Sequence, residues 1–113
     1  MKNTVSLKLN KDFKRLYYKG KSVSGGYVVV YTMKNRLGIN RLGLTAGKVV
    51  GNAVSRNRVK RLMRESYRLM EDRLETGFDI VIVSRSRAPL QSCDKIMKDT
   101  EFAMKKLGLF KTI

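Results

Sequence analysis

The sequence predicts an α+β domain, a two-layer sandwich of one sheet and helices in the order helix, strand, strand, helix, strand, helix. Apolar residues recur at spacings of three and four in three segments, which is the period of an amphipathic helix. Other segments carry the β-branched, aromatic or alternating residues typical of strands. Since 113 residues suffice for one hydrophobic core, residues 1–113 are expected to form a single domain.

The first helix is expected over residues 11–18, after a lead-in of residues 1–9 that covers an edge of the core. Asn10 is a suitable N-cap, because its side chain can accept a hydrogen bond from the first helical turn. Gly20 is a suitable stop for the helix. Residues 20–26 are then expected to form a loop.

One face of this helix carries Phe13, Leu16 and Tyr17. Leu16 is expected in the core. Phe13 and Tyr17 have two interpretations, because aromatic rings either pack in a core or offer stacking surfaces to unpaired bases of an RNA. The spacing of the residues leaves both interpretations open.

Two strands are expected next, over residues 27–34 and 41–46, paired antiparallel through a turn at 35–40. The period of two puts Val28, Val30 and Thr32 on one face of the first strand, and this face is the one more clearly expected to point into the core. The other face either packs beneath a helix or lines an open cleft, and it carries Tyr27, Val29, Tyr31 and Met33.

A long central helix is expected from Asn52 or Ser55, both good N-caps, to about Glu75, before the glycine stop at Gly77. Its apolar stripe consists of Val59, Leu62, Met63, Ser66, Met70 and Leu74, with Tyr67 and Leu69 at the margins. The opposite side carries Lys60, Arg61, Arg64 and Arg68. The helix is therefore expected to cover a core and to present a row of cations outward.

The remaining strand is expected over residues 78–84, which are nearly all apolar and therefore typical of a strand buried on both faces. Because a helix joins it to the strand at 41–46, the two are expected to be parallel. A basic loop at 85–89 follows, and a last helix is expected from its N-cap Ser92 to about Leu107.

The charge of the chain indicates a polyanionic partner. Its 25 Lys and Arg residues against 9 Asp and Glu give a net charge of +16 and a pI of about 10.4. Nucleic acid is the expected partner, ahead of a membrane surface. No apolar run is long enough to cross a bilayer and no signal peptide is evident, so a cytoplasmic location is expected.

Several kinds of chemistry are excluded by composition. The chain has no histidine, which removes the commonest general base and metal ligand. Its single cysteine, Cys93, cannot form an internal disulfide or a cysteine zinc cluster and is expected in the core. Asp12 is expected to be an N-cap and Asp79 a strand-entry residue, and no close pair of acids suggests a two-metal site. The polypeptide alone is expected to catalyse nothing and to bind no metal.

The start of the central helix favours binding to a nucleic-acid backbone. Arg56, Asn57 and Arg58 lie in its first turns, where the helix dipole disfavours cations unless an anion binds. Arginine side chains also bind phosphates through two parallel hydrogen bonds. A charged helix face is often merely solvated, but the first half of this helix contains no acid to relieve the repulsion.

The run at 52–61, with Arg56-Asn57-Arg58 at its centre, resembles the Arg-Asn-Arg signature of the bacterial ribonuclease P protein family. The resemblance covers roughly residues 10–107, and the central motif is specific. Further matching positions are Asn10-Lys11-Asp12-Phe13, Tyr17, Gly20, Ser22-Val23, Tyr31, Leu42-Gly43-Leu44-Thr45 and Lys48.

The resemblance implies the protein subunit of a ribonucleoprotein that removes the 5′ leader from precursor tRNA, a hydrolase in which the RNA subunit and its bound magnesium carry out catalysis. It also implies a ribosomal-protein-like fold with a left-handed β-α-β crossover, although most such crossovers are right-handed. The implied partners are the catalytic RNA, in a 1:1 complex, and precursor tRNA.

The resemblance also assigns site residues. The central helix would bind the catalytic RNA through Arg56, Asn57, Arg58, Lys60, Arg61, Arg64 and Arg68. A cleft between the first helix and the sheet would hold the leader through Phe13, Tyr17, Tyr31 and Lys48. Val49 departs from the family pattern, since this position is often basic in relatives.

Two other classes fit the charge and fold. A ribosomal protein or general RNA chaperone would bind many RNAs without depending on a 5′ leader. A DNA-binding regulator would need a helix that reads bases, for which Asn57 alone is thin support.

Overall fold

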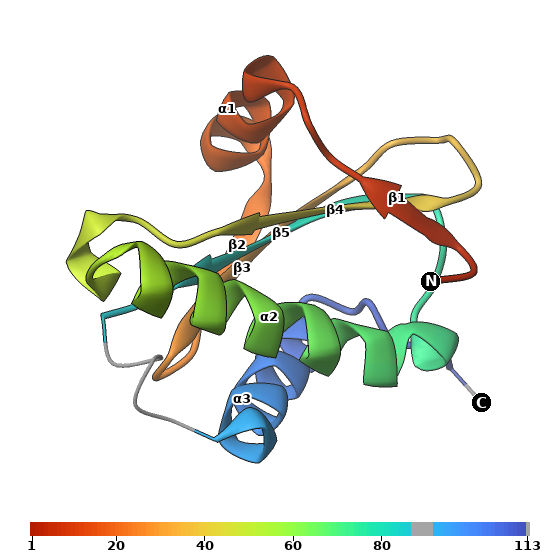
Figure 1. Cartoon of the computed structure of the whole chain (residues 1–113). Coiled ribbons are helices and arrows are strands. Elements are labelled where there is room, and N and C mark those ends of the chain that lie inside the picture. The colour runs from red at the N-terminus through yellow and green to blue at the C-terminus, as the bar shows by residue number, and fades with distance from the viewer. Residues whose placement is uncertain (87–91, 113) are drawn as a thin grey trace.

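The computed structural model describes residues 1–86 and 92–112, in which one five-stranded sheet lies between helices (Figure 1). The strands and helices are β1 (Thr4–Ser6), α1 (Asn10–Lys19), β2 (Lys21–Ser24), β3 (Val28–Lys34), β4 (Asn40–Thr45), α2 (Ala53–Met70), β5 (Phe78–Ser84) and α3 (Cys93–Lys106). Short 3₁₀ turns, Lys48–Val50 and Glu71–Arg73, flank α2. The predicted α+β class with one sheet is confirmed, but the helices lie on both faces of the sheet rather than in a single layer.

The strand order is β1-β4-β5-β3-β2, with β5 at the centre. It runs parallel to β4, as predicted, and antiparallel to β3. The predicted β3–β4 pairing is wrong, because β5 lies between the two strands. The middle of β5 is buried on both faces, so burial favours a strand on each of its sides. The left-handedness of the β4–α2–β5 crossover stays a prediction.

The helices divide between the two faces of the sheet: α2 and α3 cover one face and α1 the other (Figure 1). Val28 and Val30 point to the larger core beneath α2 and α3, as the period of two predicts. Tyr31 and Met33 point the other way and pack around Leu16 of α1. The β3 strand therefore supplies one face to the main core and one to the α1 side.

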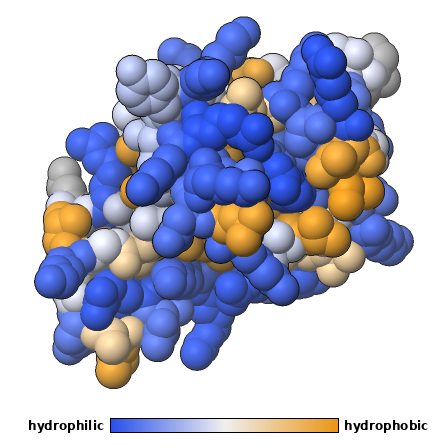
Figure 2. Space-filling view, turned by 90° about the horizontal axis from the view of Figure 1, so that it is seen from above, coloured by the Kyte–Doolittle hydropathy of each residue, from blue (hydrophilic) through white to orange (hydrophobic). Residues whose placement is uncertain are grey.

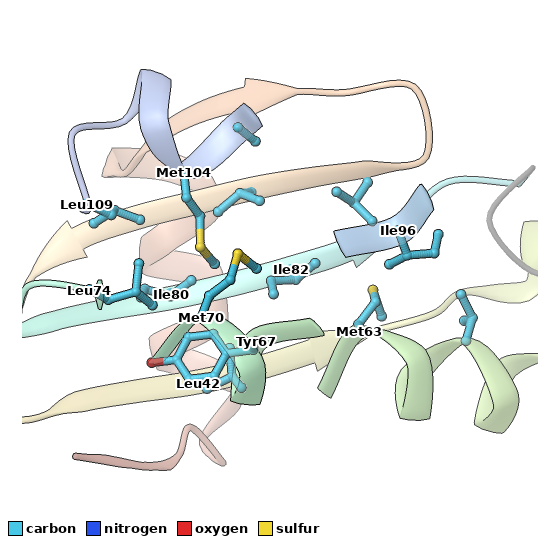
Figure 3. Packing of buried hydrophobic residues seen from close by; sticks show 14 of the residues in the cluster. Leu42, Met63, Tyr67, Met70, Leu74, Ile80, Ile82, Ile96, Met104 and Leu109 are labelled. Carbon is cyan, nitrogen blue, oxygen red and sulfur yellow. The ribbon is translucent and has the colours of Figure 1, made fainter. Parts of the chain in front are cut away.

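The main core forms where α2 and α3 cross the sheet. Met70 of α2 and Met104 of α3 point toward each other between Ile80 and Ile82 of β5 in the view of Figure 3. Tyr67, predicted at the margin of the helix stripe, is fully buried, and its hydroxyl lies 2.8 Å from Thr4 Oγ1. Leu69, at the other margin, is 53% exposed. A polar partner on β1 lets the large ring of Tyr67 enter the core.

Two strands occupy segments predicted as a lead-in and a loop. Thr4–Ser6 form β1, which pairs parallel with β4, and Lys21–Ser24 form β2, which pairs antiparallel with β3. Both are short edge strands with mixed polar residues, so neither has the alternation by which strands are identified. Their pairing depends on the adjacent strand rather than on their own sequence.

The ends of α1 also differ from the prediction. Asn10 is the first residue of the helix rather than its N-cap, and Leu9 holds the N-cap position without a side-chain hydrogen bond. Gly20 ends the helix, but with an extended backbone. A Cβ at Gly20 would lie 2.6 Å from the Leu16 carbonyl oxygen and 3.0 Å from that of Thr32. Glycine is thus needed for the close approach of α1 to β3.

The other predicted boundaries have mixed outcomes. The α2 helix ends at Met70, and Leu74 is reached through the 3₁₀ turn. Ser92 caps α3 by accepting the Lys95 N–H, as predicted. Residues 87–89 of the predicted basic loop lie outside the described residues. No helix among residues 1–86 and 92–112 has the length and apolarity needed to span a bilayer.

Asp99 of α3 fixes the turn between β2 and β3. Its carboxylate accepts the N–H groups of Gly26, Tyr27 and Val28, each at 2.9 Å. A Cβ at Gly25 would overlap this carboxylate. These three hydrogen bonds hold the β2–β3 hairpin against α3.

Replacing Asp99 by asparagine should lower the free energy of unfolding by about 1.5 kcal/mol, because hydrogen bonds to a charged acceptor contribute about 1.5–3 kcal/mol and the amide keeps only one acceptor oxygen. Urea denaturation measures the change. Asp94→Asn, on the exposed side of the same helix, is the control, and its loss should stay below about 1 kcal/mol. Equal losses in both variants would contradict the bracing role of Asp99.

Candidate nucleic-acid interface

The α2 helix begins with a side-chain N-cap. Asn52 Oδ1 accepts the Ser55 N–H at 3.0 Å, and Gly51 before it adopts a φ of 134°, which favours glycine. The first turn contains no acid. Asn57 and Arg58 are exposed and Arg56 is half-buried. The N-terminal end of α2 thus presents backbone N–H groups and arginines together, as an anion site requires.

The predicted basic row on α2 is present and largely uncompensated. Among the described residues, no acidic side chain lies within 4.0 Å of the cationic groups of Arg56, Arg58, Lys60, Arg61 and Arg64. Arg68 differs, because its Nε and Nη2 donate to Glu65 at 3.0 and 2.5 Å. These hydrogen bonds lower the pKa of the Glu65 carboxyl. The free positive charge therefore concentrates in the first part of the helix.

On the other side of the sheet, three aromatic rings form a cluster between α1 and β3. The Phe13 and Tyr17 centroids lie 6.4 Å apart, and those of Tyr17 and Tyr31 lie 4.9 Å apart in an edge-to-face arrangement. Tyr17 is 42% exposed, whereas Phe13 and Tyr31 are half-buried against the small core around Leu16. The rings therefore both close this core and form an open surface.

A hollow, here called the aromatic hollow, lies over this cluster and is lined by Asn10, Phe13, Lys14, Tyr17 and Thr45. Tyr17 Oη lies 3.3 Å from Thr45 Oγ1, which fixes the ring against β4. Figure 2 views the α1 face, where hydrophilic side chains surround small apolar patches. The hollow thus offers apolar rings within a polar, cationic surface.

The predicted cleft residues are only partly brought together. Phe13 and Tyr17 line the aromatic hollow, whereas Tyr31 contacts Tyr17 without lining it. Lys48 is exposed on the 3₁₀ turn before α2 and does not line the aromatic hollow. Lys14 of α1 supplies the cation there instead. The sequence signal for Lys14 is its position one residue after Phe13 and three before Tyr17, on an adjoining face of the helix. Val49, the departure from the family pattern, is 70% exposed.

A second hollow of about 390 Å³, here called the junction hollow, lies beside β1 and β4. Phe13 lines it as well as the aromatic hollow, and Lys60 and Arg64 of α2 reach it from the other face. The aromatic cluster and the basic row are therefore connected around this edge of the sheet, with Phe13 between them.

The α1 helix is held over the sheet by a charged cluster. Arg41 of β4 contacts Asp79 through Nε and Nη2, at 2.7 and 2.6 Å, and its Nη1 lies 3.6 Å from Asp12 of α1. The hydrogen bond from Arg41 to Asp79 raises the pKa of Arg41. Both acids are buried and have partners. Asp79 is the second residue of β5, so its predicted role as a strand-entry residue is confirmed. The N-cap role predicted for Asp12 is wrong, because Asp12 lies within α1.

Within residues 1–86 and 92–112, no three side chains among the His, Cys, Asp and Glu residues gather closely enough to hold a metal ion. Cys93 is half-buried at the start of α3, rather than fully in the core.

Comparison with known proteins supports one family. The model of the family described as Ribonuclease P matches residues 1–108. The ribonuclease P protein component of Clostridium botulinum (strain Loch Maree / Type A3) is 45% identical over 109 residues, covering 92% of this chain and 95% of the relative. That of Thermoanaerobacter sp. (strain X514) is 47% identical over 83 residues, covering 74% and 72%.

Comparison with solved structures supports the same family. The RNase P protein of Staphylococcus aureus has a TM-score of 0.85 and 34% identity, covering 94% of this chain and 97% of that one. The RNase P protein of Thermotoga maritima has a TM-score of 0.78 and 30% identity, covering 86% and 92%. These matches favour the expected role over a ribosomal protein, a general RNA chaperone or a DNA-binding regulator. The chain therefore belongs to the ribonuclease P protein family, and its predicted role as the protein component of this tRNA-processing enzyme is confirmed.

Proposed function

We propose that the chain holds the 5′ leader of precursor tRNA in the aromatic hollow while the basic row of α2 docks on the ribonuclease P RNA. The observation that supports this most directly is the position of Phe13, which lines both the aromatic hollow and the junction hollow that Lys60 and Arg64 reach. An RNA strand that leaves the aromatic hollow can thus continue around the edge of the sheet to the basic row of α2.

The aromatic hollow suits a single strand whose sequence varies. Aromatic rings stack on any base, since every base has a π face, and each stack contributes about 1–3 kcal/mol. Tyr17 offers the most exposed ring, and Lys14 beside it can contact a phosphate. Paired bases are already stacked on each other, so the hollow favours the unpaired leader over duplex RNA.

The basic row of α2 suits the backbone of a folded RNA. Its arginines can contact phosphates through two hydrogen bonds, and the cap at Asn52 leaves further backbone N–H groups free at the helix start. We assign RNA-subunit binding mainly to Arg56, Asn57, Arg58, Lys60, Arg61 and Arg64, with Arg68 contributing less because Glu65 already pairs with it.

Catalysis is assigned to the RNA subunit. The chain has no histidine to act as a general base, and the buried acids Asp12 and Asp79 are held by Arg41. Magnesium would be bound mainly by phosphates of the RNA subunit, and the protein would lower the magnesium requirement by neutralising phosphate repulsion. One basic helix and one aromatic hollow per chain fit a 1:1 complex, acting where tRNA matures, in the cytoplasm.

Photo-crosslinking tests the proposed division of the two surfaces. The complex is reconstituted with precursor tRNA that carries 4-thiouridine in its leader, or with RNA subunit that carries it near the docking site. Leader crosslinks should fall on peptides containing Tyr17 or Tyr31, and RNA-subunit crosslinks on peptides of α2. Leader crosslinks confined to α2 would contradict the proposal.

Gly43 of β4 sets the position of Phe13. A Cβ at Gly43 would lie 2.5 Å from Phe13 Cζ, so Gly43→Ala must displace the ring that separates the two hollows. We expect precursor tRNA to bind about 1 kcal/mol more weakly, at the lower end of one stacking contribution. Equilibrium binding to the reconstituted complex measures this.

The matched control is Gly47→Ala, because the nearest atom to a Cβ there is 3.9 Å away. Its affinity should equal that of the unmodified chain. If both variants bind precursor tRNA with unchanged affinity, Phe13 does not contribute to the leader site.

A further inference from the structure

A third hollow lies at the opposite edge of the sheet from the basic row of α2. It has a volume of about 410 Å³ and its lining includes Lys19, Lys21, Thr32, Lys34, Phe78 and Leu107. It is here called the lysine hollow. The strand order puts β1 and β4 at one edge and β3 and β2 at the other, so this hollow is separate from the surfaces described above.

The register of the strands explains how the lysine hollow forms. Lys21 is paired with Thr32 and Lys34 with Phe78, so all four side chains lie on the α3 face of the sheet. The β2 strand begins at Lys21 and therefore leaves the edge of β3 open beyond Thr32. Phe78 and Leu107 form an apolar floor there, since both pack against the main core.

The close approach at Gly20 places Lys19 and Lys21 on either side of this opening. A Cβ at Gly20 would lie 3.0 Å from the Thr32 carbonyl oxygen, so the end of α1 sits directly on β3. Lys19 is thereby brought to the hollow from the helix and Lys21 from the strand. Backbone geometry thus sets where the two side chains begin, Lys19 at the end of α1 and Lys21 at the start of β2.

The charge around the lysine hollow is of one sign. A shallower hollow continues from it, sharing Lys34 and Phe78 and adding Arg36. Among the described residues, no Asp or Glu lines either hollow. Among the described ion pairs, none involves Lys19, Lys21, Lys34 or Arg36. Three lysines and one arginine therefore line two hollows that share Phe78, and no acid in the described part of the chain lines them.

We propose that the lysine hollow binds a segment of single-stranded RNA, with a base against Phe78 and Leu107 and with phosphates on the lysines. Its volume lies in the range of about 300–1,000 Å³ that is typical of small-ligand sites, so one nucleotide fits. An apolar floor with a cationic rim is the pattern of sequence-tolerant single-strand binding. The shallower hollow past Lys34 lets the strand continue, which a free nucleotide would not use.

This site gives the protein contacts with RNA at both edges of its sheet. The basic row of α2 faces the β4–β1 edge, through Lys60 and Arg64, while the lysine hollow opens at the β3–β2 edge. The protein can then contact two RNA segments at once. It does so without depending on which segment occupies the aromatic hollow.

Chemical-shift mapping on the ¹⁵N-labelled full chain tests the site. A single-stranded RNA hexamer is titrated in, and the amide signals of Lys21, Lys34 and Gly108 are followed beside those of Arg58 and Arg61. We expect the first group to shift with its own saturation curve. Shifts of the Arg58 and Arg61 signals alone would overturn this inference and leave the proposed function intact.

Variants and competing ligands sharpen the test. The dissociation constant is obtained from the shift of the Gly108 amide at several salt concentrations. In Lys21→Gln/Lys34→Gln, the slope of its logarithm against the logarithm of the salt concentration should flatten by about 1.4, because each phosphate contact with a single strand contributes about 0.7. Lys95→Gln/Lys98→Gln, with the same change in charge on α3, should leave that slope unchanged. Uridine monophosphate or an acidic peptide that saturates the same amides as tightly as the hexamer would overturn the assignment to an RNA strand.

Discussion

Replacing Arg58 and Arg61 by alanine should weaken assembly with the ribonuclease P RNA on the order of 100-fold. Both residues are exposed on α2, and no acid among the described residues lies within 4.0 Å of their charged groups. A hydrogen bond to a charged group contributes about 1.5–3 kcal/mol, and two losses at the lower end of this range give about 3 kcal/mol, an effect of this size. The log–log salt slope should flatten by about 2, one unit for each lost phosphate contact. Filter binding at several salt concentrations measures both quantities.

Two controls separate docking from net charge. Lys95→Ala/Lys98→Ala makes the same change in charge on α3 and should weaken assembly only slightly. Arg68→Ala should have a smaller effect than either arginine of the pair, because Arg68 is already paired with Glu65. If all these variants lose affinity in proportion to charge alone, α2 is not a specific docking surface.

Replacing Tyr17 or Tyr31 by alanine should weaken the binding of leader-bearing precursor tRNA and leave mature tRNA unchanged. Tyr17 contacts both other rings of the aromatic cluster, so its loss opens the aromatic hollow. The expected loss is about 1–3 kcal/mol, the contribution of one stacked base. Affinities of the reconstituted complex for precursors with leaders of increasing length, and for mature tRNA, measure this.

The next residue of the helix provides a matched control. Tyr18 is 90% exposed and does not line the aromatic hollow, so Tyr18→Ala should bind precursor tRNA normally. Equal losses for precursor and mature tRNA in the Tyr31 variant would mean that this half-buried ring serves only the core beneath α1.

The parts of the fold with strong periodicity could be predicted from the sequence. The α2 stripe and the buried face of β3 follow from spacings of 3.6 and 2 residues, and the parallel β4–β5 pair follows from the helix that joins the two strands. The position of Tyr67 could not, because its burial depends on a hydroxyl partner, Thr4, 63 residues away in the sequence. Strand order likewise depends on which strand needs two neighbours, which periodicity does not show.

The candidate site was predictable to a similar degree. The charge and cap of α2 are local features, and the aromatic residues are spaced along one helix and one strand. Lys48 and Lys14 show the limit, since both lie close in sequence to the site and only the path of the chain decides which lines the aromatic hollow. The lysine hollow has no sequence signal, because it depends on where the short β2 strand begins.

The most direct test of the central claim is cleavage of precursor tRNA at low magnesium by the chain alone, by a bacterial ribonuclease P RNA alone, and by the two together. We predict cleavage only in the mixture, at the 5′ end of the mature tRNA, and we predict that raising magnesium restores activity to the RNA alone. Cleavage by the chain alone, or no stimulation of the RNA by the chain, would contradict the central proposal. In that proposal the protein holds the 5′ leader and neutralises phosphate charge, while the RNA catalyses the cleavage.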